Sequence, residues 1–134
     1  MKKRWNKGNE IYWVIIHDDS VTAGVFVKTL GDGYGNGYGT EYIVDLNIDS
    51  KKYASIRVEC YNSTWACRGH GMNDDWTEAE DNIKREEAIK FVNEIKKEFE
   101  EAEDETRDVK ELYEKVREFV IKNIEDYEEY DEDY

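Results

Sequence analysis

The fold is decided by residues 77–134, TEAEDNIKREEAIKFVNEIKKEFEEAEDETRDVKELYEKVREFVIKNIEDYEEYDEDY, which contain neither Gly nor Pro and space their apolar residues as a helix does. Thr77 and Glu80 form a capping-box pattern, which predicts the start of a helix. Beyond it, the spacing alternates between four and three residues, the period of a helix packed along one stripe. The stripe consists of Ala88, Val92, Ile95, Phe99, Ala102, Thr106, Val109, Tyr113, Val116, Val120, Asn123 and Tyr127.

This stripe is weakest at Ala102 and Thr106, and two arrangements remain open there. The chain turns back, which gives a hairpin of two helices of roughly 25 residues each. Alternatively it continues as a single rod of about 50 residues, roughly 75 Å long. Typical helix lengths favour the hairpin, whereas the unbroken heptad phase favours the rod. A rod would need a second copy to cover its stripe, so it predicts a coiled-coil homodimer.

Residues 1–72 are predicted to form an antiparallel β meander of four to five strands. Residues 11–16 are a continuous apolar run, which indicates a buried strand. Apolar and polar residues alternate in residues 21–28, 42–48 and 53–61, which predicts three half-buried strands. A short fifth strand is predicted at residues 65–68.

Short connections imply that helices cover one face of this sheet. We therefore expect a single α+β domain, with an antiparallel sheet over residues 1–72 and two long acidic helices over residues 73–134. No run approaches 18 apolar residues, and the basic start at residues 1–5 is followed by no apolar signal segment. These features predict a cytoplasmic protein that does not contact a membrane.

Charge divides the chain into two unlike halves. Residues 1–72 carry nine Lys and Arg against eight Asp and Glu, whereas residues 73–134 carry ten against twenty-five. Such an excess repels nucleic acid and attracts cationic protein surfaces. The sequence therefore predicts a basic protein partner and no direct contact with nucleic acid.

The end of the chain is the most acidic segment, and two interpretations apply to it. A self-repelling acidic tail is commonly a disordered, solubilising extension. Its interleaved tyrosines favour the second interpretation, a binding segment, because Tyr supplies contact area at low entropic cost. The predicted partner-binding residues here are Glu125, Asp126, Tyr127, Glu128, Glu129, Tyr130, Asp131, Glu132 and Asp133.

A glycine-rich stretch at residues 31–39 joins two predicted strands. It lacks the third glycine of a dinucleotide fingerprint, and no predicted helix follows it to receive a pyrophosphate. The simplest interpretation is a long hairpin tip. Tyr34 and Tyr38 on this glycine backbone also suit an adaptable recognition loop, and we include both among the predicted partner-binding residues.

Two cysteines and a histidine raise the question of a metal or catalytic site. A tight turn predicted at Ser63 and Thr64 would place Cys60 opposite Cys67, within reach of a disulfide. Adding His70 gives three possible metal ligands, but the spacing departs from the usual zinc patterns. A Cys60–His70 nucleophile pair lacks an orienting third group. We therefore expect no metal, no cofactor, no catalytic residue and no enzymatic activity.

In its size, acidic helices and Tyr-interleaved acidic tail, the chain resembles the small inhibitors that bacteriophages make against host defence nucleases, the anti-CRISPR proteins. The resemblance implies a non-enzymatic inhibitor, acting in the host cytoplasm, that binds a basic nucleic-acid-handling protein. In it, carboxylates would stand where phosphates otherwise bind. The alternative is an oligomeric nucleotide-binding protein, with a pocket between sheet and helices that includes Arg57 and Arg68.

Overall fold

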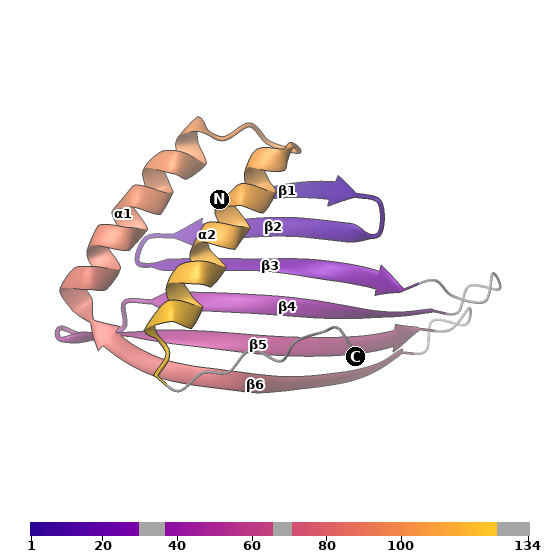
Figure 1. Cartoon of the computed structure of the whole chain (residues 1–134), viewed down its shortest axis with the longest axis horizontal. Coiled ribbons are helices and arrows are strands. Elements are labelled where there is room, and N and C mark those ends of the chain that lie inside the picture. The colour runs from indigo at the N-terminus through magenta and orange to yellow at the C-terminus, as the bar shows by residue number, and fades with distance from the viewer. Residues whose placement is uncertain (30–36, 66–70, 126–134) are drawn as a thin grey trace.

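The structure is a computed structural model that describes residues 1–29, 37–65 and 71–125. Six strands in sequence order form one antiparallel sheet, and two helices follow them (Figure 1). The α+β class is thus confirmed, with six strands instead of the expected four to five. The elements are β1 (Lys2–Lys7), β2 (Glu10–His17), β3 (Ser20–Thr29), β4 (Gly37–Asn47), β5 (Tyr53–Trp65), β6 (Gly71–Lys84), α1 (Arg85–Glu101) and α2 (Arg107–Asn123).

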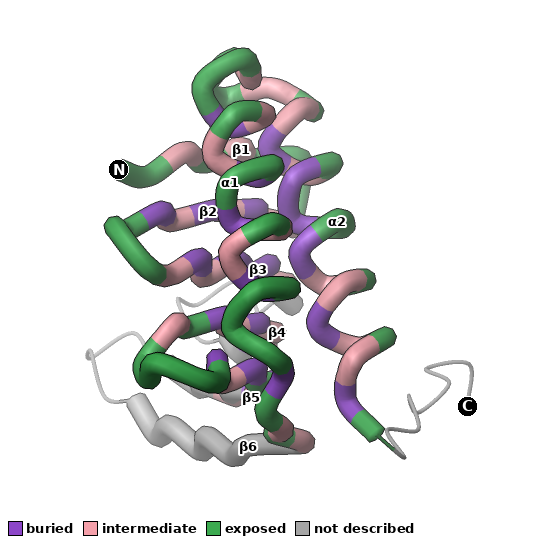
Figure 2. Tube along the Cα trace, turned by 90° about the vertical axis from the view of Figure 1, so that its left-hand side faces the viewer, coloured by how far each residue is buried: buried purple, intermediate pink, exposed green. Residues whose placement is uncertain are grey.

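One face of the sheet carries the core. The expected alternation in β3 and β5 is confirmed, because Val21, Ala23, Ile56 and Val58 are all buried. The helix stripe is buried in the same core, from Ala88 to Phe99 in α1 and from Val109 to Val120 in α2. Figure 2 shows both helices on this side of the sheet, so they form a second layer over one face, as the short connections predict.

The first additional strand is β1, at one edge of the sheet. It pairs with β2 through a turn of two residues, since Lys7 lies opposite Glu10 and only Gly8 and Asn9 lie between them. Gly8 has a φ of 58°, a conformation that glycine adopts without strain. The basic start of the chain therefore forms an edge strand of the sheet.

The second additional strand, β6, corrects the predicted start of the helical region. Thr77 and Glu80 do not cap a helix, because they lie in β6 opposite Glu59 and Arg57 of β5. The sheet therefore continues past residue 72 to Lys84, and α1 begins at Arg85 without a side-chain cap. Pairing along the whole of β5 outweighs the helix propensity of residues 78–80, Glu-Ala-Glu, in this segment.

The helical hairpin is confirmed and the continuous rod is wrong. Both helices have 17 residues, shorter than expected. The chain leaves α1 at Ala102, passes Glu105 with a φ of 59°, and enters α2 at Thr106. Thr106 Oγ1 accepts a hydrogen bond from the backbone N–H of Asp108, which caps α2. Without a rod, the coiled-coil dimer loses its basis.

The predicted turn at Ser63 and Thr64 is also wrong, because strand β5 continues through both residues to Trp65 and pairs with β4 over this whole length. Residues 66–68 of the predicted fifth strand lie outside the described residues. Cys60 is buried and lies opposite Trp76, so no turn at Ser63 and Thr64 brings it opposite Cys67. Cys67 and His70 lie outside the described residues.

Aromatic and basic side chains of β1 and β2 contact the two helices. Trp5 stacks on Tyr12, and Tyr12 packs against Tyr113 of α2 with ring centroids 5.7 Å apart. Burial and a hydrogen bond to Glu10 raise the pKa of the Tyr12 phenol, so it stays protonated. Lys3 Nζ donates to two backbone carbonyls at the end of α1, those of Phe99 and Ala102.

Among the described residues, none of the helices has the length and apolarity needed to cross a membrane.

On the face of the sheet away from the helices, the ring of Phe26 lies over Gly39. Substitutions at these two positions test whether the two residues are in contact. A Cβ at Gly39 would lie 2.3 Å from the Phe26 ring. We expect Gly39→Ala to lower the free energy of unfolding by about 1–3 kcal/mol, as overpacking does. In a Phe26→Ala background the same change should cost much less. Chemical denaturation of the four proteins measures this coupling, and strictly additive effects would contradict the contact.

The bond from Lys3 to the end of α1 gives a second prediction. Lys3→Met keeps the aliphatic stem but removes the charged donor, so we expect a loss of about 1–2 kcal/mol in the free energy of unfolding. Lys7→Met, an equal loss of charge at an exposed position of the same strand, is the control and should have little effect. Equal effects of the two changes would show that net charge, not this cap, is responsible.

Candidate functional site: the acidic surfaces

The negative charge of the helical region is concentrated in one segment. Residues 98–108, which we call the acidic corner, carry seven carboxylates and a single base. By contrast, residues 85–97 carry three carboxylates against four bases, and residues 109–125 carry four against four. The helices are thus balanced along most of their length. The expected rows of carboxylates along both helices are replaced by one cluster where the helices meet.

Local hydrogen bonds fix the backbone of the acidic corner. The backbone N–H of Glu103 donates to Asp108 Oδ2 at 3.0 Å, and Thr106 Oγ1 donates to the carbonyl of Glu103 at 2.8 Å. Between these contacts, Glu103, Asp104 and Glu105 are exposed. Lys3, at the end of α1, supplies a positive charge beneath the cluster. The corner therefore holds its outer carboxylates on an ordered turn.

A second acidic site lies where the C-terminal segment leaves α2. The backbone N–H of Glu125 donates to Asp81 Oδ2 of β6 at 3.0 Å, and that of Asn82 donates to Asp81 Oδ1 at 2.7 Å. These two bonds, that from Glu125 first, lower the pKa of the Asp81 carboxyl. The first residue of the predicted acidic tail is therefore joined to the acidic edge strand of the sheet.

Most of the predicted partner-binding residues, Tyr34 and the tail from Asp126 to Asp133, lie outside the described residues. Tyr38 belongs to β4, where its backbone lies opposite Thr29 and Thr64. Of the whole set, only Glu125 has a described side chain, and it is exposed. Its anchoring by Asp81 carries no signal in the sequence, because the two residues lie 44 positions apart.

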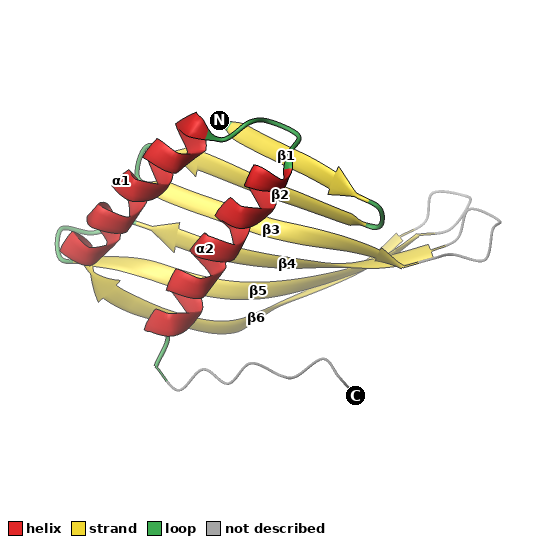
Figure 3. Ribbon diagram, turned by 45° about the horizontal axis from the view of Figure 1, so that its top comes forward, coloured by secondary structure: helices red, strands yellow, loops and turns green. Residues whose placement is uncertain are grey.

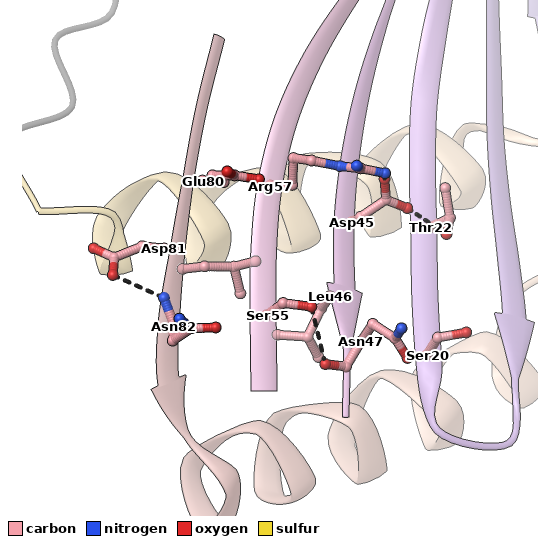
Figure 4. Close-up of a pocket in the computed structure, with 11 residues that line it drawn as sticks. Ser20, Thr22, Asp45, Leu46, Asn47, Ser55, Arg57, Glu80, Asp81 and Asn82 are labelled. Atoms are coloured by element: carbon pink, nitrogen blue, oxygen red, sulfur yellow. Dashed lines mark hydrogen bonds and ion pairs between the residues drawn. The ribbon is translucent and has the colours of Figure 1, made fainter. Parts of the chain in front are cut away.

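A groove of 690 Å³ lies on the open face of the sheet, across β3 to β6 (Figure 4). Asp45 is at its centre: Thr22 Oγ1 donates to Asp45 Oδ1 at 2.7 Å, and Arg57 Nη2 lies 3.4 Å from Asp45 Oδ2. Arg57 Nε also lies 2.8 Å from Glu59 Oε1. The lining residues are Ser20, Thr22, Asp45, Leu46, Asn47, Ser55, Ile56, Arg57, Glu80, Asp81 and Asn82.

The chemistry of this groove suits a cationic group. Its hydroxyl, amide and carboxylate oxygens accept hydrogen bonds, and its single base, Arg57, is already held between two carboxylates. Neither His nor Cys is among the described residues that line it. The sequence shows these residues only as the polar positions of alternating strands, and their convergence depends on a register that the sequence does not specify.

The nucleotide pocket predicted between sheet and helices does not include Arg57. That side chain lies on the opposite, open face of the sheet. Arg68 lies outside the described residues. Within the parts of the chain that the structure describes, no group of three His, Cys, Asp or Glu side chains is placed to hold a metal ion.

The Asp81 bonds give a prediction about the root of the tail. Folding lowers the pKa of the Asp81 carboxyl below its ordinary value of 3.8. The ionised carboxylate therefore stabilises this contact at pH values above 3.8, and this contribution is lost as the pH falls through the lowered pKa of the folded state. We expect Asp81→Ala to speed hydrogen exchange at the Glu125 and Asn82 amides at neutral pH. Asp81→Asn, which keeps an acceptor oxygen, should have a smaller effect. Exchange rates unchanged in Asp81→Ala would contradict the anchoring.

No family model matches the chain, and no match is found among curated proteins or solved structures. The proposed function therefore rests on the charges and hydrogen bonds of the acidic surfaces.

Proposed function

We propose that this protein is a non-enzymatic inhibitor that binds a basic, nucleic-acid-handling protein, such as a defence nuclease. The acidic corner and the acidic segment that begins at Glu125 form the contact surface. One observation carries the proposal: on helices that are otherwise balanced in charge, seven carboxylates are gathered within eleven residues, at an ordered turn and the helix ends beside it. A solubilising surface needs no such concentration, whereas recognition of a cationic surface does.

The physical basis of the interaction is substitution of carboxylates for phosphates. A groove that binds duplex DNA is lined by Lys and Arg side chains that meet about one negative charge per 1.7 Å of helix axis. The outer carboxylates of the corner, on adjacent residues Glu103, Asp104 and Glu105, lie about 3.8 Å apart along the backbone, close to the roughly 3.4 Å spacing of charges along one strand. Because the turn is internally hydrogen bonded, less conformational entropy is lost on binding than with an unstructured acidic peptide.

The tail adds charge at a second point. After Glu125, the chain contains six more carboxylates and three tyrosines in nine residues. The bond from Glu125 to Asp81 places the start of this segment on the helix side of the sheet, the side that also carries the corner. Two acidic contacts on one molecule raise the effective concentration of the second once the first has formed.

The proposal predicts a salt-sensitive, corner-dependent interaction. The chain is used to capture proteins from a bacterial lysate at low salt, and the captured protein is identified and tested for nucleic-acid binding. We expect the chain to compete with nucleic acid for that protein, and its affinity to fall steeply with salt. An affinity that does not change with salt would overturn the proposal.

Matched variants separate location from net charge. Glu103→Gln, Asp104→Asn and Glu105→Gln together remove three charges from the corner, and amides in place of the acids of residues 126–133 remove the tail charges. Glu111→Gln, Glu114→Gln and Glu118→Gln remove three charges from the balanced helix α2 as the control. We expect at least a tenfold loss of affinity, about 1.4 kcal/mol, in each test variant and little loss in the control.

A further inference from the structure

The face of the sheet away from the helices is uncovered across its width. Both helices lie on the opposite side, and none of the described segments crosses this open face (Figures 2 and 3). Five large apolar side chains lie on it and are only partly buried: Ile11, Trp13, Ile15, Phe26 and Ile43. They belong to β2, β3 and β4, so they form one continuous strip that is displaced from the centre of the sheet toward β1.

Charges of opposite sign flank this apolar strip. The register aligns side chains in rows across the sheet, and one row reads Lys2, Ile15, Thr22, Asp45, Arg57, Glu80 from β1 to β6. The adjacent row begins with Arg4 and Trp13 and ends on β5 with Glu59. Bases therefore lie along β1, and carboxylates predominate from β4 to β6.

The aromatic side chains of the strip are held in place before any partner binds. Trp13 Nε1 donates to Glu41 Oε2 at 2.9 Å, and its ring lies against Gly24, where a Cβ would be 2.5 Å away. Phe26 lies in the same way over Gly39. Fixed aromatic anchors in the centre of a surface, with charges around them, are the usual arrangement of a protein interface.

We propose that this open face binds a second copy of the chain, forming a two-fold symmetric dimer with sheet against sheet. A two-fold axis parallel to the strands places β1 of each copy over β6 of the other. Lys2 then faces Glu80 of the second copy, β3 of each copy lies over β4 of the other with Phe26 and Ile43 near the axis, and β2 lies over β5. An axis across the strands would instead place β1 over β1 and oppose like charges, so charge selects the first arrangement.

Pairing of sheet edges in a symmetric dimer is disfavoured by the same charges. Strand β1 has four bases among its six residues, and β6 has five carboxylates against one base. A symmetric pairing of either edge with itself would bring like charges together. The face therefore remains as the self-complementary surface.

The size of the face is close to that of a stable interface. Six strands about 4.8 Å apart span roughly 24 Å, and about eight residues along the strands span roughly 26 Å. The product is a flat area of roughly 600 Å² per copy, and protruding side chains add to the surface that is buried. This area approaches the approximately 800 Å² per partner of a standard interface. The groove around Asp45 gives the Lys2 side chain of the second copy carboxylates to contact.

The dimer leaves the surface of the proposed function free. The acidic corner and Glu125 lie on the helix side, so two sets of them face outward from opposite sides of the dimer. The inference does not depend on the proposed function, and either can fail without the other.

The test is the mass of the full chain in solution, measured by sedimentation at low salt and at concentrations up to about 100 μM. We expect a dimer that Lys2→Glu with Arg4→Glu weakens at least tenfold, about 1.4 kcal/mol. Ile43→Asp, in the apolar strip, should also yield a monomer, with circular dichroism showing that it stays folded. Lys90→Glu with Lys97→Glu, the same charge change on exposed positions of α1, should leave the mass unchanged.

A charge exchange identifies the arrangement of the copies. Asp45→Lys with Glu80→Lys should also give a monomer, because each acidic side becomes basic. Mixed with the Lys2→Glu, Arg4→Glu protein, it should form a heterodimer, since both pairs of facing sides are again opposite in sign. A monomeric wild-type chain, a dimer insensitive to Lys2→Glu with Arg4→Glu, or the absence of the heterodimer would overturn the proposal.

Discussion

The structure depends on one packing constraint: two short amphipathic helices cover one face of a six-stranded sheet. Val116 and Val120 of α2 are completely buried in the same core as Leu46 and Ile56 of the sheet. Because the helix stripe fits between alternating strand residues, the same alternation sends every other side chain to the opposite face. The open face, with its apolar strip and acidic groove, is thus a direct consequence of a two-layer fold. The hairpin between α1 and α2 follows as well, since a continuous rod would carry the second half of the stripe past the edge of the sheet.

The central elements could be predicted from the sequence and the two edge strands could not. Strands β2 to β5 show either a continuous apolar run or a clear alternation, and the helix stripe keeps its period from Ala88 to Val120. In β1, only Trp5 is a large apolar residue, and the signal that could have revealed the strand is the Gly8-Asn9 turn after it. In β6, the alternation is reduced to Ala79, Asp81 and Ile83, with Glu80 and Asn82 between them. An edge strand pairs on one side only, so its sequence needs little apolar content and carries a weak signal.

The acidic surfaces show the same limit in a different form. A count of charges along the chain correctly finds the acidic half, but it does not show which charges come together in space. The acidic corner depends on where the helices end, and that end is fixed by the Thr106 cap and by Lys3, which lies 99 residues from its acceptor Ala102. The groove depends on the register of β3 to β6, which brings Thr22, Asp45 and Arg57 side by side. Sequence separation hides each of these contacts, whereas the total charge and the class of partner it favours are visible from the start.

The basic first strand shows how register and charge specify one another. Successive side chains of β1 point to opposite faces, so Lys3 reaches the carbonyls at the end of α1 while Lys2 and Arg4 lie on the open face. A slip of one residue would exchange these sets and send Trp5 into solvent, away from Tyr12. Four bases in six residues are therefore not a uniform patch. Lys3 completes the helix layer, Lys2 and Arg4 give the uncovered face its positive side, and the contact of Trp5 with Tyr12 fixes this arrangement.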